Sequence, residues 1–197
     1  MLFSPKKRYV VQTLGSEVLR RKADPIPAVT AEIRELAEYM YQTLRQFDGI
    51  GLAAPQVGHS LRLVVLAVPM DSMSSPPSPG ERDLLPQMPL VLVNPEIVDR
   101  FGNVAVRDEG CLSVPDIFAP VPRPSRVILR SQTLDGGIIT AECGGLLGRC
   151  IQHELDHLDG IIFCDRVIPA EKRLIESDMR RLERYGSKHQ YQRVISR

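Results

Sequence analysis

The sequence predicts an α+β protein. We expect antiparallel or mixed β-sheets packed around a central helix that carries an H-E-x-x-H motif, with a further helix near the C-terminus. Three observations support this class. Apolar residues recur at helical spacing in separated segments. Other segments alternate apolar and polar residues as strands do, and two of them flank a hairpin turn signal. Helices and strands do not follow the rhythm of βαβ units, which argues against a doubly wound parallel sheet.

The first expected helix spans residues 28–47, where apolar residues recur every three or four positions and charged residues fill the opposite face. Asp48 and Gly49 end it. A run of small residues then leads to an expected strand at 61–68. The segment 69–89 is rich in proline and serine, so we expect a surface loop without a catalytic role.

Strand patterns resume at 90–94 and at 104–107. Residues 126–133 and 137–141 then flank an Asp-Gly pair, which is a strong signal for a β-hairpin turn. The sequence therefore predicts several short antiparallel strands in the middle of the chain.

Two helices follow. Gly144 and Gly145 open the helix that carries the histidines, and Gly160 is placed to end it. Pro169 begins the last helix, and residues 169–197 are expected to form this helix and a tail. The expected buried stripe of the last helix consists of Leu174, Ile175, Met179 and Leu182.

Composition limits the class of protein. We expect residues 1–197 to form one domain, because a chain of this length can bury a core without disulfides. The formal net charge of +1 argues against specific nucleic-acid binding. No apolar run reaches the roughly 20 residues of a membrane helix, and no secretory signal is evident. The four cysteines are therefore interpreted as reduced thiols in a cytoplasmic enzyme.

The stretch QHELDHLDG at 152–160 predicts a metal site. His153 and His157 are four residues apart, so on a helix their imidazoles share one face. A divalent ion held there lowers the pKa of a bound water toward about 7, and Glu154 is placed to take its proton. Asp156 and Asp159 are expected to orient the imidazole rings. The neighbouring residues are apolar, and a metal explains why polar side chains lie among them.

The third ligand is open on spacing alone. Glu176 lies at the distance from His157 at which gluzincin-type proteases place a carboxylate ligand, whereas no third histidine follows at metzincin spacing and His189 is too late. Cys111 is the other candidate, in a segment where glycine and proline interrupt regular structure. The remaining cysteines (Cys143, Cys150 and Cys164) are interpreted as packing residues.

Three stretches together resemble the signature motifs of peptide deformylases, in order and in content. They are GIGLAAPQ at 49–56, EGCLS at 109–113 and QHELDH at 152–157. The resemblance extends from the first helix to about Arg166. It implies removal of the formyl group from the N-terminal formylmethionine of newly synthesised proteins, with release of formate.

The resemblance also implies roles for single residues. Cys111, His153 and His157 match the metal ligands. The native ion is expected to be Fe²⁺, which Ni²⁺, Co²⁺ or Zn²⁺ can replace. Glu154 matches the general base and acid for a metal-bound water that attacks the formyl carbon.

Further positions match the substrate site of the family. Gln56 and the backbone N–H of Leu112 match the groups that stabilise the oxyanion. Ile50, Gly51 and Gly110 match positions that hold the substrate in an extended pose. Asp116 stands where many relatives have glycine, which leaves open how the pocket rim contacts residues after the methionine.

Two other functions remain as alternatives. A gluzincin-type endopeptidase would use Glu176 as its third ligand, but it leaves the Gly110-Cys111-Leu112 stretch unexplained. A metal-stabilised binding module without activity would dock on the ribosome through the C-terminal segment. Hydrolysis of a formylated peptide separates the enzyme from the binding module.

Overall fold

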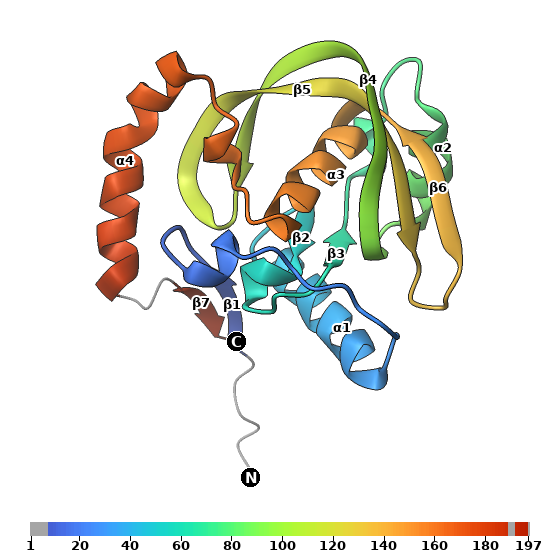
Figure 1. Cartoon of the computed structure of the whole chain (residues 1–197), viewed down its shortest axis with the longest axis horizontal. Helices are drawn as coiled ribbons and strands as arrows, with labels where there is room; N and C mark the ends of the chain where they lie inside the picture. The colour runs from blue at the N-terminus through green and yellow to red at the C-terminus, as the bar shows by residue number, and fades with distance from the viewer. Residues whose placement is uncertain (1–7, 189–191, 197) are drawn as a thin grey trace.

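The computed structural model describes residues 8–188 and 192–196, and it confirms the predicted α+β class (Figure 1). Helix α3 lies at the centre, with β4, β5 and β6 on one side and β2 and β3 on the other. Five strands form an antiparallel sheet in the order β2-β3-β4-β5-β6, and β1 pairs with β7 in a separate two-stranded sheet. The helix with the two histidines is thus enclosed by sheet.

The element bounds are β1 Arg8–Gln12, α1 Ala31–Gln46, β2 Gly51–Ala53, β3 Leu63–Leu66, α2 Pro79–Leu84, β4 Leu90–Cys111, β5 Val114–Gln132, β6 Ile138–Cys143, α3 Gly145–Leu158, α4 Pro169–Lys188 and β7 Gln192–Ser196. Short 3₁₀ turns are η1 Glu17–Arg20, η2 Ala54–Val57, η3 Met70–Ser72, η4 Leu85–Gln87 and η5 Phe163–Asp165. Helix α1 begins three residues later than predicted, and β3 is shorter than the predicted strand at 61–68.

Strands β4 and β5 form one long hairpin, whereas the sequence pattern predicted separate short strands at 90–94 and 104–107. The pairing shifts register at several points between Val93 and Val104. Each bulge adds a residue and resets which side chains face the core, so the period of two is lost in the sequence. The hairpin closes at Cys111, which pairs with Val114 across a two-residue turn.

Helix α3 is buried on all sides over 150–158. Gly144 is its N-cap residue and Gly145 has a φ of +56°, so both predicted glycines open the helix. Gly160 has a φ of +74° just beyond the end, as expected for a glycine that terminates a helix. The helix can bury polar residues only where each finds a partner or a ligand.

The prediction of a surface loop at 69–89 is wrong for 78–85. Helix α2 lies within it, and Ser78, Glu81 and Leu84 are buried. Ser78 and Glu81 form a capping box with proline at the first helical position, a signal that the surrounding prolines obscured.

The capping box of α2 also holds the start of α3. The Ser78 hydroxyl accepts a hydrogen bond from the Gly144 backbone N–H at 2.9 Å. The Glu81 carboxylate accepts from the backbone N–H groups of Ser74 and Ser78 at 2.8 Å each, and from their hydroxyls. A Cβ added at Gly145 would lie 2.4 Å from a Glu81 oxygen. A carboxylate at this position favours the N-terminus of α3 electrostatically.

Two predictions for the C-terminal region need correction. Leu174 is 72% exposed and does not belong to the buried stripe of α4, whereas Ile175, Met179 and Leu182 pack against the core. The expected tail contains β7, which pairs with β1 from Arg8↔Ser196 to Gln12↔Gln192. The local sequence pattern of a strand does not indicate that it pairs with a strand far away in the sequence, so the pairing of β1 with β7 was not predicted. Within 8–188 and 192–196, no helix has the length and apolar character needed to cross a membrane.

We expect Glu81→Ala to lower the free energy of unfolding by about 1–3 kcal/mol, because it leaves buried hydroxyl and N–H groups without an acceptor. Urea denaturation of the purified variant measures this. Asp83→Ala is the matched control, since Asp83 is exposed on the same helix and should change stability by less than about 0.5 kcal/mol. Equal effects of the two variants would show that the buried carboxylate does not hold the start of α3.

Candidate metal centre

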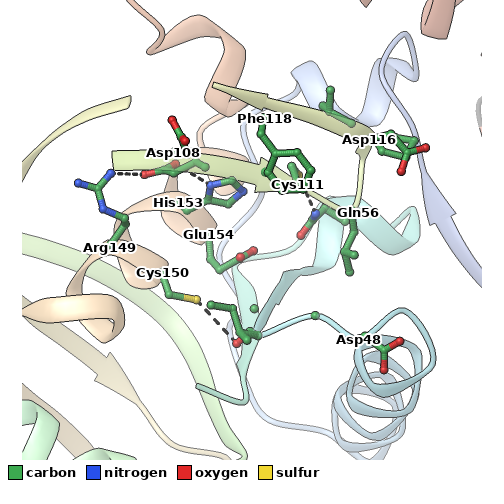
Figure 2. Close-up of a pocket in the computed structure, with 18 of the residues that line it drawn as sticks. Asp48, Gln56, Asp108, Cys111, Asp116, Phe118, Arg149, Cys150, His153 and Glu154 are labelled. Atoms are coloured by element: carbon green, nitrogen blue, oxygen red, sulfur yellow. Dashed lines mark hydrogen bonds and ion pairs between the residues drawn. The ribbon is translucent and has the colours of Figure 1, made fainter. Parts of the chain in front are cut away.

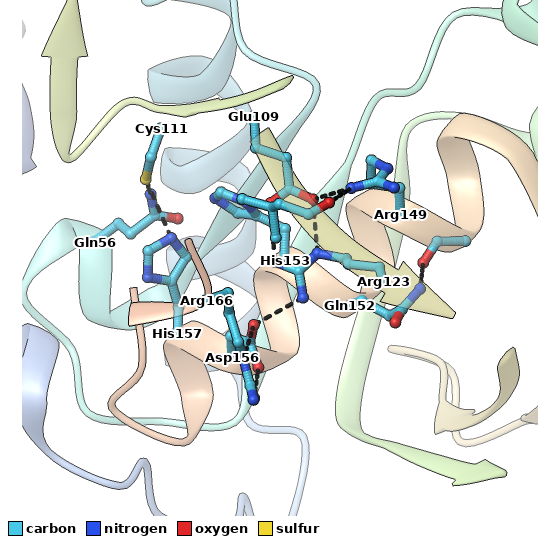
Figure 3. Close-up of polar contacts among 12 residues, drawn as sticks. Gln56, Glu109, Cys111, Arg123, Arg149, Gln152, His153, Asp156, His157 and Arg166 are labelled. Atoms are coloured by element: carbon cyan, nitrogen blue, oxygen red, sulfur yellow. Dashed lines mark hydrogen bonds and ion pairs between the residues drawn. The ribbon is translucent and has the colours of Figure 1, made fainter. Parts of the chain in front are cut away.

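The structure brings Cys111, His153 and His157 together (Figure 3). Cys111 is the last residue of β4, and the histidines lie one turn apart on α3. One ligand atom from each lies within 4.8 Å of the others, and the Cys111 Sγ is 3.2 Å from His157 Nε2. Among residues 8–188 and 192–196, this is the group of acids, histidines and cysteines that converges closely enough to hold an ion.

The three donors fit a divalent metal ion. A tetrahedral ion with bonds of about 2.0–2.3 Å keeps its ligand atoms roughly 3.3–3.7 Å apart, and the 3.2 Å between Cys111 Sγ and His157 Nε2 is close to this range. His157 is fully buried and presents its Nε2 atom to the Cys111 Sγ. A thiolate with two neutral imidazoles is a donor set that suits Fe²⁺, Zn²⁺ and related ions.

Glu109 fixes the orientation of His153. Its Oε2 atom lies 2.9 Å from His153 Nδ1, so the imidazole donates from Nδ1 and keeps the Nε2 lone pair for a metal. Glu109 also accepts from Arg123 at 2.6 and 2.9 Å and from Arg149 at 2.7 Å. Burial acts to raise the pKa of Glu109, but hydrogen bonds from Arg123 and His153 outweigh it and lower this pKa to about 2. The carboxylate is therefore ionised.

The expectation that Asp156 and Asp159 orient the imidazole rings is wrong. Asp156 bonds to Arg123 at 2.8 Å and to Arg166 at 2.7 Å, and Asp159 bonds to Arg62 at 2.9 Å. The side chains of Asp156 and Asp159 therefore bind arginines and do not hold either imidazole ring. Asp156 instead anchors the guanidinium that Glu109 shares (Figure 3).

Sequence reasoning missed Glu109 as the residue that holds the histidine. A signal was present, because residues two apart on a strand face the same side, so Glu109 accompanies Cys111. Both side chains point toward α3, whereas Asp108 is exposed. The arginines could not be found in this way, because Arg123 comes from β5 and Arg149 from α3.

Glu154 lies beside the donor group and is 4% exposed. Its Oε2 atom has no hydrogen-bond partner among the described residues. Burial raises the pKa of Glu154 to about 7. A Cβ added at Gly51 would lie 2.4 Å from Glu154 Oε1 and 2.7 Å from Cys150 Sγ, so only glycine leaves room for the carboxylate at this point.

Gln56, in the turn η2, is buried with a fixed amide orientation. Its Oε1 atom accepts from the Ala53 backbone N–H at 2.8 Å. Its Nε2 atom therefore points the other way, toward Ser113 Oγ at 3.3 Å and Cys111 Sγ at 3.4 Å. The amide is placed to donate a hydrogen bond to a group beside the three donor atoms.

A cavity of about 440 Å³ opens over these residues (Figure 2). The sequence-predicted residues that line it are Ile50, Gly51, Gln56, Gly110, Cys111, Leu112, His153 and Glu154. Apolar walls come from Leu146, Cys150 and Phe118. A cavity of this size, mostly apolar with a few convergent polar groups, is typical of a small-ligand site.

The other candidate ligands lie elsewhere. Glu176 pairs with Arg180 at 2.8 Å on α4, with 56% of its side chain exposed. Cys150 contacts the Ile50 carbonyl at 3.7 Å, and burial raises its pKa well above the usual thiol value. Burial likewise raises the pKa of Cys143 and of Cys164 to about 12, as expected for packing residues.

Comparison with known proteins gives a consistent family. The family model described as polypeptide deformylase matches residues 9–173. The chain is 46% identical over 162 residues to "Peptide deformylase 2" of Gloeobacter violaceus, and the aligned region covers 82% of this chain and 80% of that protein. It is 39% identical over 174 residues to a peptide deformylase of Salinibacter ruber, which covers 87% of each.

A solved structure agrees with these matches. The fold is similar to a peptide deformylase from Synechococcus elongatus in complex with actinonin. The TM-score is 0.73 at 35% identity, and the match covers 90% of this chain and 87% of that one.

We expect Glu109→Ala to lower the free energy of unfolding by about 3–5 kcal/mol, because it leaves the charges of Arg123 and Arg149 without their shared carboxylate. Equilibrium unfolding in urea measures the change. Asp108→Ala, one residue earlier and exposed, serves as the control and should stay within about 0.5 kcal/mol of the unmodified protein. If both variants unfold at the same urea concentration, the buried ionic cluster does not carry the stability assigned to it.

Proposed function

The chain belongs to the polypeptide deformylase family, and from this premise we propose how its own residues remove the formyl group from N-formylmethionyl peptides. The protein is a metal-dependent hydrolase. The observation that carries the proposal is the position of the Glu154 carboxylate, whose Oε2 atom has no hydrogen-bond partner among the described residues, beside three converging metal donors at a cavity. We further propose that residues 1–197 act as a single catalytic domain.

We propose that Cys111, His153 and His157 hold the ion, with Fe²⁺ as the native metal and Ni²⁺, Co²⁺ or Zn²⁺ as substitutes. Bound there, a divalent ion would lower the pKa of a water and polarise the formyl carbonyl. Glu109 keeps His153 in the tautomer that presents Nε2 to the site. With a divalent ion bound, the Cys111 thiolate would leave the site with one net positive charge, which would favour an oxyanion.

Glu154 acts as the base and then the acid. Its carboxylate takes a proton from the attacking water as the water oxygen forms a bond to the formyl carbon. When the carbon–nitrogen bond breaks, Glu154 gives this proton to the leaving nitrogen, which becomes the free amine of methionine. Formate is the other product. Burial raises the pKa of Glu154 to about 7, and a carboxyl group with this pKa can both accept and donate a proton near neutral pH.

Gln56 and the backbone N–H of Leu112 stabilise the oxyanion. The Gln56 amide is held by Ala53 so that its N–H groups face the site before substrate arrives. Leu112 lies in the turn directly after Cys111 and lines the same cavity. Two neutral donors fixed in advance stabilise the developing charge without reorganisation.

The substrate lies extended between two segments of the sheet. Ile50 and Gly51 precede and begin β2, and Gly110 is next to the end of β4, so their backbones face the cavity from two sides. The apolar wall that includes Leu146 and Cys150 accommodates a methionine side chain. We propose a cytoplasmic location, which suits an enzyme that acts on nascent chains, and contact with the ribosome through the C-terminal segment.

We expect the purified protein, loaded anaerobically with metal, to release formate and a free amine from formyl-Met-Ala-Ser. Glu154→Ala should keep its metal and lose at least about 10⁴-fold in kcat, because one group serves in two proton transfers. Measurement of kcat together with metal content checks both parts. Glu176→Gln is the control and should retain full activity. Turnover in Glu154→Ala close to that of the unmodified enzyme would refute the mechanism.

A second expectation concerns the third ligand. Cys111→Ser should bind Zn²⁺ about 10- to 100-fold more weakly or worse, because the thiolate is replaced by a poor ligand. Titration against a chromophoric chelator gives the affinity without reference to activity. Glu176→Gln should bind the ion unchanged. The reverse pattern would assign the third position to Glu176 and restore the endopeptidase alternative.

A further inference from the structure

A second cavity, of about 400 Å³, lies between the closed end of the β4–β5 hairpin, α4 and β7. Its walls include Thr13, Ile117, Leu182 and Tyr185. Asp178 and Arg181 also line it, and they form an ion pair with each other at 3.0 Å. Pro115, Asp116 and Arg193 line both this cavity and the one over the metal donors. The two cavities therefore adjoin at these three residues, which form the junction between them.

Arg193 is held in place at this junction. It lies on β7 opposite Val11 of β1, and it is half-buried. Its guanidinium carbon lies 5.1 Å from the centre of the Phe47 ring, at the end of α1. Phe47 directly precedes the Asp48–Ile50 segment that lines the first cavity. The structure gives Arg193 no carboxylate partner among residues 8–188 and 192–196, so its charge is available to a ligand.

Asp116 stands at the same junction on β5. It is exposed and has a φ of +63°, a conformation that side-chain-bearing residues adopt uncommonly. In the described part of the chain its carboxylate makes no ion pair. The Arg193 guanidinium and the Asp116 carboxylate thus both lie at the junction of the two cavities.

The substrate has a continuation that must leave the metal centre. The formyl end lies at the donor atoms, and each further residue of an extended chain advances about 3.3–3.6 Å. Only the residues that follow the formylated methionine can reach the junction while the formyl group remains in place.

We propose that the second cavity binds the residues that follow the formylated methionine, and that Arg193 and Asp116 select them by charge. This inference rests on the proposed function. Arg193 favours an acidic side chain at the junction and Asp116 favours a basic one. The guanidinium is half-buried and fixed on an aromatic ring, whereas the carboxylate is exposed to solvent, so Arg193 dominates and the enzyme prefers acidic residues.

The test uses formyl-Met-Ala and hexapeptides that begin with formyl-Met-Ala, in which glutamate or lysine is placed in turn at positions three to six. The measured quantity is the ratio of kcat/KM for the glutamate peptide to that for the lysine peptide. At the position that reaches the junction, Arg193→Gln should lower this ratio about two- to fivefold, and Asp116→Asn should raise it by a smaller factor, because the Asp116 carboxylate is exposed and screened by solvent. Arg193→Lys should retain the ratio. For formyl-Met-Ala, which lacks residues three to six, kcat/KM should change less in each variant than kcat/KM for the charged hexapeptides does.

Arg100→Gln and Asp71→Asn are the matched controls, since both residues are exposed and line neither cavity. A ratio that stays constant in Arg193→Gln and Asp116→Asn, with normal turnover of formyl-Met-Ala, overturns the inference and leaves the function intact. Equal losses for every peptide, formyl-Met-Ala included, assign Arg193 a structural role and also overturn it. No turnover of any formyl peptide by the unmodified protein refutes the proposed function, and the inference falls with it.

Discussion

The buried carboxylate of Glu109 joins the two parts of the structure that form the metal centre. It accepts from Arg123 of β5, from Arg149 of α3 and from His153 of α3, while Arg123 also bonds to Asp156. Desolvating these charges costs several kcal/mol for each ion, so the cluster is favourable only because every member is bonded. Its contribution is geometric. It fixes the register of β4 against α3, and Cys111, two residues after Glu109, is thereby placed beside the histidines.

The same helix is held at both ends. Glu81 and Ser78 meet its first turn at Gly144, and the Ala23 backbone N–H donates to the Leu158 carbonyl at its last residue at 2.8 Å. Glycine is required where a neighbour approaches closely, as at Gly51 against Glu154. The role proposed for Glu154 in proton transfer requires that few hydrogen bonds hold its carboxylate, so the position of the carboxylate depends on the rigidity of α3.

The sequence alone predicted which residues gather at the candidate site more accurately than it predicted the strands and helices. The spacing of His153 and His157 follows from helix geometry, and the motif order placed Cys111 with them, although spacing by itself did not choose between Cys111 and Glu176. The long hairpin escaped prediction because its bulges reset the alternation. Helix α2 escaped because prolines dominate its segment. The ionic cluster of Glu109, Arg123, Arg149 and Asp156 was not predicted, because its members come from separate elements and pairing between residues far apart in sequence leaves no periodic signal.

Strands β1 and β7 connect both ends of the chain to the metal centre. Just after β1, the Leu14 backbone N–H donates to the Ser113 carbonyl at 2.8 Å, and Ser113 lies in the turn that follows Cys111. Strand β7 pairs with β1 and brings Arg193 to the cavity rim. The segment that fixes the turn beside the thiolate is thus the same segment that positions the C-terminal strand. A substrate residue bound at Arg193, as we propose, would contact the β1–β7 sheet, and the residue that follows β1, Leu14, is bonded to the turn next to Cys111 that contains Leu112.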